Sequence, residues 1–490
     1  MRPLNKKKNA QTHRLPRNVA RALQTVLADD QIILDEGGRQ AFETDALTAY
    51  KAVPLAVVLP TTTEEVAEIV KIAKAYEVPL VPRGAGTSLA GGALPLPQSI
   101  VLCLSRMTQI LDVNTTNRTA RVQAGVTNLA ISQAVSGLGF FYAPDPSSQL
   151  ACTIAGNVAM NSGGAHCLKY GVTTHNLLGV QLVTTDGEII EIGGSYLDPA
   201  GYDLLSLITG SEGGLGIVTE ATVMLRPKPE GARPLLLGFD SAESAGNCVA
   251  AIIAEGIIPV AIEFMDKPAI KVCEEFAGAG YPLDAEALLI IEVEGSAEEI
   301  DLGFQQIMRI AKDFLPMHSR VAKSMDEADA IWLGRKAAFG AIGRISDYLC
   351  MDGVIPLAKL GHVLAKISEI CKSYKFDVAN IFHAGDGNLH PLILYDANQP
   401  GAIERVEACG AEILELCVQA GGCITGEHGV GIEKKELMQL QFTPIDLLNQ
   451  MRVKNVFDPA WLLNPEKVFP SEMAEAFRDG RWDLFHEGLG

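Results

Sequence analysis

The chain has 490 residues, and its 40 Lys and Arg residues against 59 Asp and Glu residues give a formal net charge of −19. Hydrophobic residues make up 48% of the chain, which excludes an intrinsically disordered protein. The acidic surface argues against nucleic acid as a partner, and no run of about 18 apolar residues could cross a membrane. A chain of this length is expected to form two or three domains.

The ten cysteines are scattered along the chain, and no two of them form a C-x-x-C pair. Zinc fingers, thioredoxin-like motifs and the usual iron–sulfur ligation are therefore unsupported. Scattered cysteines in a long acidic chain are typical of small buried thiols in a reducing compartment. We expect a cytoplasmic protein.

The chain opens with a basic segment, residues 1–28, which contains seven basic residues and no acidic one. No apolar stretch follows it, which argues against a secretory signal. We expect a mobile basic tail, with a transit peptide as the alternative.

A β-α-β unit follows. Residues 53–60 and 78–81 are short apolar runs typical of buried strands. Between them, Thr62 and Glu65 form a capping-box pattern at the start of an amphipathic helix. A glycine-rich loop, residues 83–92, comes directly after the second strand.

Further elements are predicted along the same domain. A helix is expected with Thr127 as its cap and Gly137 at its end. Strand-like runs occupy residues 100–104, 119–124, 179–184 and 188–192.

Prolines clustered around Gly231 predict a linker over residues 226–234. Beyond it we expect an antiparallel sheet covered by helices on one face. A partly helical segment, 432–470, closes this region. The strands and helices expected between the linker and this segment occupy 235–239, 242–255, 287–294, 298–314 and 357–374.

Three glycine-dense segments in the first domain, around Gly84, Gly156 and Gly213, indicate a bound cofactor. Glycine is unfavourable inside regular elements, so three such clusters indicate backbone packed against something flat or extended. The first cluster is not a dinucleotide-binding fingerprint, because G-x-G-x-x-G would need glycine where Leu89 stands. P-loop spacing is also absent from the sequence.

The segment from His383 to His390 predicts a metal site. Asp386 and Gly387 give a strong signal for a two-residue β-hairpin turn of type I′. With that turn, His383 would face His390 across the two strands, roughly 5 Å apart at Cβ. Two imidazoles so placed can chelate zinc, iron or nickel, and an added carboxylate extends the choice to manganese.

A third ligand is predicted at Glu427, which precedes His428 between two glycines. Two histidines and one carboxylate leave coordination positions open for a substrate. We predict His383, His390 and Glu427 as metal ligands and His428 as a general base. The alternative is a set of ordinary polar residues at loop ends.

Positive charge for an acidic substrate is predicted in the apolar stretch 331–345, which contains Arg335, Lys336 and Arg344. Arginine can hold a carboxylate through two parallel hydrogen bonds. A solvated helix face is the alternative interpretation.

Eight segments in order resemble the flavoprotein family of vanillyl-alcohol oxidase and p-cresol methylhydroxylase. Within it, they are similar to the D-2-hydroxyacid dehydrogenase branch, over about residues 40–470. The segments are PRGAGTSLAGGALP, YAPDPSSQ, GNVAMNSGGAHCLKYG, GSEGGLGIVTE, GRISDYLCMDG, VANIFHAGDGNLHP, GEHGVG and LLNPEK.

The resemblance implies an α+β fold. An N-terminal FAD-binding domain of two α/β subdomains (40–228) precedes a cap domain with an antiparallel sheet and helices (229–430). A C-terminal helical segment (431–470) packs back on the FAD domain. The residues implied to wrap the FAD diphosphate are Arg83, Gly84, Ala85, Gly86, Thr87 and Ser88. Those implied to line the flavin and adenosine are Pro144, Asp145, Ser148, Thr153, Gly156, Asn157, Gly163, Gly164, Glu212, Gly216, Ile217, Val218 and Asn464.

By the same resemblance, a divalent metal, with zinc as the first expectation, is held by His383, His390 and Glu427. His428 takes the hydroxyl proton while the α-hydrogen passes to the flavin as hydride, and Arg335 holds the substrate carboxylate. Some family members attach the flavin covalently through a histidine in the diphosphate loop. Thr87 stands there, so non-covalent FAD is expected.

The implied activity is oxidation of a small 2-hydroxy acid, first of all glycolate to glyoxylate. Members acting on D-2-hydroxyglutarate carry a basic residue where Cys350 lies and Asn where Leu392 lies. The missing partners for a second carboxylate favour a small monocarboxylate. D-lactate oxidation is the alternative, and a flavin-binding subunit without chemistry is a minor one.

The resemblance also implies partners: a second FAD-binding subunit and an iron–sulfur subunit, at the inner face of the cytoplasmic membrane. Membrane association is expected only through these partners.

Overall fold

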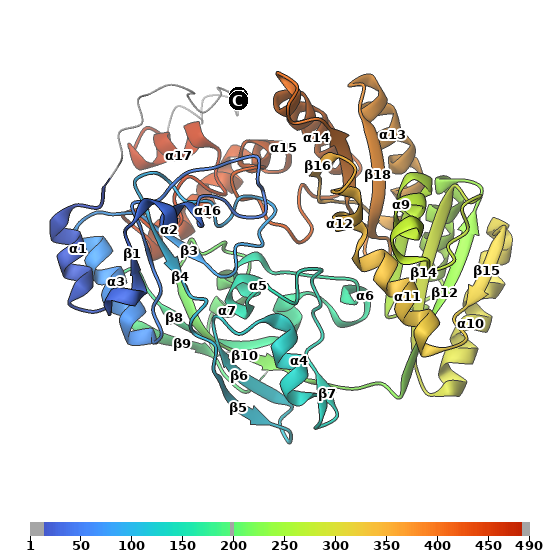
Figure 1. The fold of residues 1–490 in the computed structure, drawn as a ribbon, viewed down its shortest axis with the longest axis horizontal. Helices are drawn as coiled ribbons and strands as arrows, with labels where there is room; N and C mark the ends of the chain where they lie inside the picture. The colour runs from blue at the N-terminus through green and yellow to red at the C-terminus, as the bar shows by residue number, and fades with distance from the viewer. Residues whose placement is uncertain (1–13, 197–199, 483–490) are drawn as a thin grey trace.

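The computed structural model describes residues 14–196 and 200–482. Figure 1 shows two lobes, coloured blue to green and yellow-green to brown. We call residues 14–230 the first lobe and residues 231–430 the second lobe. The C-terminal helices, in red, lie back over the first lobe.

The first lobe begins with a four-stranded sheet in the order β1-β2-β4-β3, in which β2, β4 and β3 run parallel. Helix α3 (Thr63–Ala75) connects β2 to β3, as predicted, and the Thr62 hydroxyl accepts the N–H of Glu65 at its start. The strands are β1 (Ile32–Ile33), β2 (Ala56–Val58), β3 (Leu80–Arg83) and β4 (Ile100–Cys103).

A five-stranded antiparallel sheet completes the first lobe, in the order β5-β6-β10-β8-β9. One hydrophobic core spans both sheets, with Val58 and Leu102 from the first and Val122 and Leu182 from the second. The strands are β5 (Ile110–Asn114), β6 (Thr119–Gln123), β8 (Leu177–Val183), β9 (Ile189–Gly193) and β10 (Ile217–Met224). The helices here are α2 (Glu36–Gln40), α4 (Asn128–Ser136), α5 (Ile154–Met160), α6 (Cys167–Tyr170) and α7 (Leu204–Ile208).

The second lobe is built on an antiparallel sheet in the order β15-β12-β14-β13-β18-β19-β17, and β20 joins β16 to the free part of β18. Its first strands are β12 (Gly231–Phe239), β13 (Ala261–Asp266), β14 (Ala287–Gly295) and β15 (His318–Val321). The others are β16 (Asp347–Cys350), β17 (Gly353–Val354), β18 (Asp377–His383), β19 (Asn388–Leu389) and β20 (Pro391–Tyr395).

Helices cover both faces of this sheet, so the expectation of helices on one face is wrong. Successive residues of β14 belong to two different cores: Leu289 and Ile291 to one, Leu288 and Ile290 to the other. An unbroken apolar run such as ALLII in β14 is typical of a strand buried on both faces, whereas a strand covered on one face alternates apolar and polar residues. The first core includes α8 (Ala242–Ala254), α10 (Ala297–Ala311), α13 (Leu360–Ser373) and α14 (Ala402–Gln419). The second includes α9 (Lys267–Ala277), α11 (Met325–Lys336) and α12 (Ala338–Ile342).

The linker predicted over 226–234 is mostly strand. Residues Arg226–Pro227 form β11 and pair with β7 (Phe140–Phe141), and β12 already begins at Gly231. Pro234 lies inside β12, one residue before the pairing with β15 starts. Its carbonyl accepts the N–H of Ala322 just beyond β15, and because the N–H and C=O of a strand residue point to the same side, the missing N–H breaks no bond to β14.

The predicted basic tail is also shorter than expected. Residues 1–13 lie outside the described residues, but Arg17–Gln24 form helix α1. Val19 and Leu23 on this helix are buried in the core of the first lobe. The basic residues of α1 are on its exposed side, and its apolar side holds the helix against the core of the first lobe.

The C-terminal segment joins the two lobes. It contains α15 (Met438–Gln441), α16 (Pro444–Phe457) and α17 (Ser471–Arg478). Leu447 and Met451 of α16 belong to the core of the second lobe, whereas Leu463 belongs to that of the first. Leu80 of β3 donates its N–H to the Leu462 carbonyl, which fixes the returning chain beside the glycine-rich loop. Across the described ranges, no helix is long and apolar enough to cross a membrane.

Candidate active site between the two lobes

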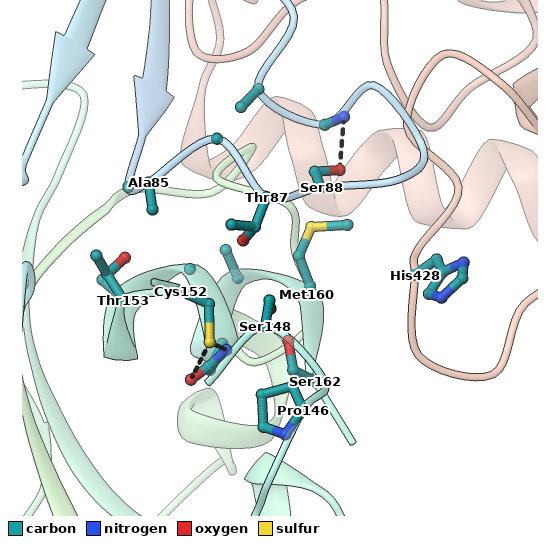
Figure 2. Close-up of a pocket in the computed structure, with 18 of the residues that line it drawn as sticks. Ala85, Thr87, Ser88, Pro146, Ser148, Cys152, Thr153, Met160, Ser162 and His428 are labelled. Atoms are coloured by element: carbon teal, nitrogen blue, oxygen red, sulfur yellow. Dashed lines mark hydrogen bonds between the residues drawn. The ribbon is translucent and has the colours of Figure 1, made fainter. Parts of the chain in front are cut away.

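A cavity of about 470 Å³ lies where the two lobes meet, and both lobes line it. One side, which we call the glycine wall, consists of residues 83–88, 153–157 and 211–218. The opposite side, which we call the charged wall, consists of Lys336, Phe339, Tyr348, His390, Glu427 and His428. Figure 2 shows His428 across the cavity from Ala85 and Thr153.

The glycine wall is shaped by close approach of the backbone to neighbouring groups. A Cβ atom on Gly84 would lie 2.1 Å from Oγ1 of Thr153. Gly86 has a φ of +75°, and a Cβ there would lie 2.0 Å from Nη2 of Arg83. Both positions therefore require glycine. Oγ1 of Thr153 is buried, with no hydrogen-bond partner among the described residues, so this wall fits a ligand with polar groups.

The structure brings most of the predicted cofactor residues together in this wall. Those lining the cavity are Arg83, Gly84, Ala85, Gly86, Thr87, Ser88, Ser148, Thr153, Gly156, Asn157, Glu212, Gly216, Ile217 and Val218. Five others, Pro144, Asp145, Gly163, Gly164 and Asn464, lie outside the lining.

The residues outside the lining make contacts that support the site. Asp145 lies 2.9 Å from Nδ1 of His166. A Cβ on Gly163 would come within 2.9 Å of the Glu427 carboxylate. Asn464 donates its amide hydrogens to the carbonyls of Gly92 and Glu212.

Glu212 has a second role that its sequence context did not reveal. Its two carboxylate oxygens accept the N–H groups of Val430 and Gly431, at 2.7 and 2.8 Å. The glycine wall is thus bonded directly to the loop that carries Glu427 and His428.

The predicted hairpin register is wrong. His383 pairs with Asn388 rather than with His390, and residues 384–387 form a four-residue turn. A type I′ turn needs positive φ at both central residues, but of Asp386 and Gly387 only Gly387 has one. The two histidine rings still meet, with centroids 5.2 Å apart, because His390 lies two residues beyond Asn388.

These rings and Glu427 fit a divalent metal. Nε2 of His383 and Nε2 of His390 each lie 3.5 Å from Oε1 of Glu427. Ligand atoms around a tetrahedral zinc with bonds of roughly 2.1 Å would lie about 3.4 Å apart. Both ring nitrogens of His390 are buried without a hydrogen-bond partner in the described structure. Nε2 of His383, Nε2 of His390 and Oε1 of Glu427 are therefore placed so that all three could bind one metal ion.

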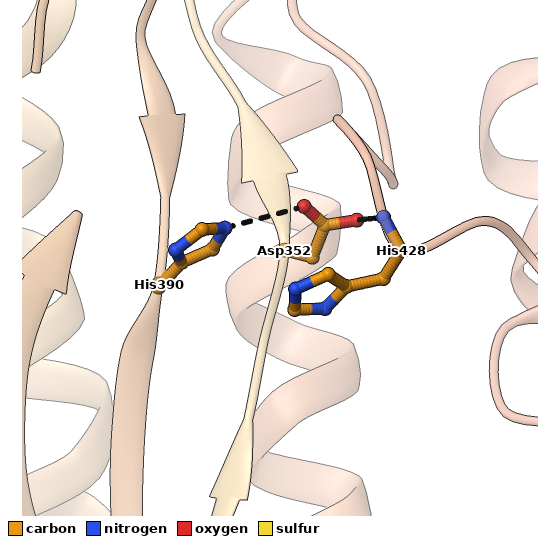
Figure 3. Close-up of side chains that lie close together, drawn as sticks. All are labelled: Asp352, His390 and His428. Atoms are coloured by element: carbon orange, nitrogen blue, oxygen red, sulfur yellow. Dashed lines mark hydrogen bonds and ion pairs between the residues drawn. The ribbon is translucent and has the colours of Figure 1, made fainter. Parts of the chain in front are cut away.

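A second group of possible ligands, Asp352, His390 and His428, shares one histidine with the first (Figure 3). Asp352 is fully buried. Its oxygens already accept hydrogen bonds from the Thr425 hydroxyl and from the backbone of the loop that follows Thr425. A carboxylate occupied in this way is a poor ligand. Of the two groups, His383, His390 and Glu427 are therefore the better candidate metal ligands.

Arg335 lies behind the charged wall. Its guanidinium is 3% exposed and contacts Glu263, with Nε 2.7 Å and Nη2 2.5 Å from Oε2. The other oxygen of Glu263 lies 2.7 Å from Nδ1 of His383. This contact orients the ring so that Nε2 faces Glu427. The neighbouring residue, Lys336, lines the cavity.

The charges around the three candidate metal ligands, His383, His390 and Glu427, set the protonation states of Glu427 and His428. Burial raises the pKa of Glu427, but the hydrogen bond from His383 and the nearby imidazoles outweigh it and lower this pKa to about 2. Burial, reinforced by His390 and Lys434, lowers the pKa of His428 to about 4. At neutral pH Glu427 is an anion, and His428 is a neutral imidazole that can accept a proton.

Among the residues of this site that sequence reasoning missed, four bear on the charged wall. Phe339 and Tyr348 line the cavity, with ring centroids 6.2 Å apart. Glu263 and Asp352 support the cluster from behind. The available signal was weak: each of these two carboxylates is the one acid in a short apolar run, VAIEFM for Glu263 and YLCMDG for Asp352. Isolated acids in apolar strands are unfavourable unless they have buried partners.

Two family descriptions match the chain. The FAD binding domain matches residues 54–193, and the C-terminal domain of FAD linked oxidases matches residues 228–468.

Curated relatives match over most of their length. "Glycolate oxidase subunit GlcD" of Escherichia coli K12 is 50% identical, covering 92% of this chain and 89% of the relative. The protein of the same name from Bacillus subtilis is 40% identical, covering 89% and 93%. "D-lactate dehydrogenase" of Archaeoglobus fulgidus is 34% identical, covering 87% and 94%.

Solved structures share the fold at low sequence identity. A p-cresol methylhydroxylase structure has a TM-score of 0.78 at 17% identity, covering 92% of this chain and 96% of that one. A 4-ethylphenol oxidase from Gulosibacter chungangensis has a TM-score of 0.77 at 19% identity, covering 93% and 98%. These matches confirm the expected fold class.

Proposed function

The chain belongs to the FAD-linked oxidase family, and from this premise we propose that it oxidises glycolate to glyoxylate with non-covalently bound FAD. One observation carries the proposal. Across the cavity from the glycine wall, His383, His390 and Glu427 aim donor atoms at one point, and the neutral base His428 lies next to them.

Glycolate oxidation removes one hydrogen from the α-carbon and one from the hydroxyl oxygen that this carbon carries. The hydroxyl proton and the electron pair of a C–H bond must leave in opposite directions, so the substrate needs a base on one side and an electron acceptor on the other. The charged wall supplies the base and the glycine wall holds the acceptor. FAD, when bound, supplies the acceptor for the hydride that leaves the α-carbon.

We propose that a divalent metal, with zinc as the first choice, is held by His383, His390 and Glu427. When bound, it would polarise the hydroxyl oxygen and lower the pKa of the hydroxyl group. Glu263 holds the His383 ring through Nδ1 and so keeps Nε2 available to the metal. The ring of His428, stacked on His390 at 5.0 Å, receives the hydroxyl proton.

The substrate carboxylate needs a positive partner. We keep Arg335 as the proposed partner, although in the structure its guanidinium is bound to Glu263. Lys336, the basic residue on the cavity surface, is the second candidate.

The choice of glycolate follows the relatives. The two relatives named as a glycolate oxidase subunit are 50% and 40% identical, whereas the one named D-lactate dehydrogenase is 34% identical. D-lactate oxidation is therefore the second candidate. The two acids differ by one methyl group, which changes selectivity by only about 1–3 kcal/mol.

The glycolate oxidase relatives are subunits by name, which supports partner subunits for this chain as well. We propose a second FAD-binding subunit and an iron–sulfur subunit that receive the electrons. We place the assembly at the cytoplasmic face of the membrane, attached through those partners.

The test is anaerobic reduction of the bound flavin. Purified protein loaded with FAD and Zn²⁺ is mixed separately with glycolate, D-lactate, L-lactate and D-2-hydroxyglutarate, and the loss of flavin absorbance is followed. We expect rapid reduction by glycolate, slower reduction by D-lactate and none by D-2-hydroxyglutarate. Reduction by D-lactate alone would favour the second candidate. No reduction by any acid, with or without added partner subunits, would contradict an enzymatic role.

A further inference from the structure

Asp352 is the most heavily bonded carboxylate next to the charged wall, and no step of the proposed reaction uses it. It follows β16 in the second lobe and is fully buried, as is Lys434. Burial of a charge is costly unless several partners compensate for it. The partners of Asp352 therefore indicate what it does.

Most of those partners come from one short loop, and Nε2 of His390 lies 3.5 Å from Oδ1 on the other side (Figure 3). Oδ2 of Asp352 accepts the hydroxyl of Thr425 at 2.5 Å and the N–H groups of Gly426 and His428 at 3.0 and 2.9 Å. The N–H of Glu427 lies 3.2 Å from Oδ1. Three successive backbone N–H groups thus point at one carboxylate, which is an anion-binding nest. Figure 3 shows the contact to His428.

A buried cation completes the arrangement. Nζ of Lys434 lies 3.3 Å from Oδ2 of Asp352 and 3.2 Å from the Gly429 carbonyl. A hydroxyl, three backbone N–H groups and an ammonium group around one carboxylate favour its anionic form.

Besides Asp352, Thr425 also holds the loop between residues 425 and 429, because its hydroxyl accepts the N–H of Gly429 at 2.9 Å. Gly426 packs against the Asn388 side chain, where a Cβ would lie 2.5 Å from Cγ. Gly429 has a φ of +83°. Glycines at both ends leave the backbone free to take several conformations, so the bonds to Asp352 select one of them.

We propose that Asp352 is a positioning residue: it fixes the loop so that Glu427 and His428 are held together at the metal cluster. This inference rests on the proposed function of that cluster. Because Glu427 and His428 are adjacent in the chain, anchoring this one loop positions both the proposed metal ligand and the proposed base. Loss of the anchor should therefore weaken metal binding and slow turnover together, while the glycine wall stays intact.

The test compares metal affinity in matched variants of the FAD-loaded protein. Zn²⁺ and Mn²⁺ are titrated separately, and kcat and KM for glycolate are measured alongside. Asp352→Asn should weaken Zn²⁺ binding by about 10–100-fold and lower kcat, with FAD content unchanged. Asp458→Asn is the matched control, since Asp458 is an equally buried carboxylate that accepts Lys454 and the N–H groups of Leu462 and Leu463. Its metal affinity should stay within about twofold of wild type.

A milder pair covers the case in which Asp352→Asn does not fold. Thr425→Val removes one hydrogen bond to the carboxylate and should weaken Zn²⁺ binding by about tenfold. Thr425→Ser keeps the hydroxyl and should restore wild-type affinity. Equal Zn²⁺ affinity in wild type, Thr425→Val and any folded Asp352→Asn would overturn the positioning role. Failure of the wild-type protein itself to bind either metal or to be reduced by the acids would instead overturn the proposed function.

Discussion

The two walls of the cavity are built from different material. The glycine wall is mainly backbone and small side chains from three segments of the first lobe, whereas the charged wall carries imidazoles and a carboxylate. One wall recognises its ligand by close approach, and the other acts through charge and proton transfer. A change to one wall should therefore leave the function of the other intact, and the following predictions test this separation.

The largest effect is expected at His428. His428→Ala should lower glycolate turnover by about 10²–10⁴-fold, because a general base contributes that much to proton transfer. FAD content should not change. Steady-state kinetics and the flavin spectrum measure the two quantities, with His362→Ala, on the exposed side of α13, as a control. Near-normal turnover in His428→Ala would remove this residue from the mechanism.

The second prediction concerns metal binding and a substitution at Glu427. Glu427→Gln replaces an anionic ligand by a neutral amide and should weaken Zn²⁺ binding by more than about 100-fold. Isothermal titration with Zn²⁺ checks the affinity, and FAD binding should be normal. Unchanged Zn²⁺ affinity would move the metal away from His383, His390 and Glu427.

A substitution at Gly84 should have the opposite result: FAD binding is weakened while metal binding is retained. Gly84→Val places a side chain where a Cβ lies 2.1 Å from Thr153, and should weaken FAD binding by about 10–100-fold. Zn²⁺ affinity should be retained. Gly137→Ala is the control, because no described atom lies within 4 Å of a Cβ there and its φ is −68°. If both variants bind FAD equally, the close approach of this loop does not matter.

Phe339 tests whether the charged wall also selects substrates by size. Its ring centroid lies 6.2 Å from both His390 and Tyr348, so it limits the space beside the metal cluster. Phe339→Ala should improve kcat/KM for D-2-hydroxybutyrate relative to glycolate by about tenfold. An unchanged ratio would indicate that the substrate lies elsewhere in the cavity.

The smallest effect concerns the junction of the lobes at His166. It lies 2.9 Å from Asp145 of the first lobe and 3.2 Å from Glu292 of the second. Although burial lowers it, these carboxylates raise the pKa of His166 from 6.5 to about 10. A raised folded-state pKa contributes stability that is complete below pH 6.5 and is lost as pH rises to about 10.

His166→Gln should remove this part of the pH dependence. The melting temperature of the wild type should exceed that of the variant by about 3 °C at pH 6, with the difference vanishing near pH 10. Thermal melts across this range provide the measurement. A difference that stays constant with pH would show that the imidazole acts through packing rather than charge.

Local patterns in the sequence predicted many of the elements. The helix over Thr63–Ala75 and the strand over Ala287–Gly295 follow from apolar periodicity and capping residues, which act over a few residues. The linker prediction is wrong because proline ends a strand only where its N–H is needed, and Pro234 lies at a strand position that needs no N–H donor. The prediction of helices on one face is wrong because the apolar run in β14 lacks the alternation that a single covered face produces.

In the candidate site, too, the sequence predicts the residues involved but not the long-range contacts between them. Residue types alone indicate what the site can do: glycines allow close approach, and His383, His390, Glu427 and His428 supply the chemistry. How these residues meet depends on the packing of the chain. His383 pairs with Asn388 instead of His390, Glu263 approaches His383 from β13, and Asp352 receives the loop at residues 425–429. Such contacts join segments far apart in the chain, and residue spacing carries no information about them because they depend on how the sheets and helices pack.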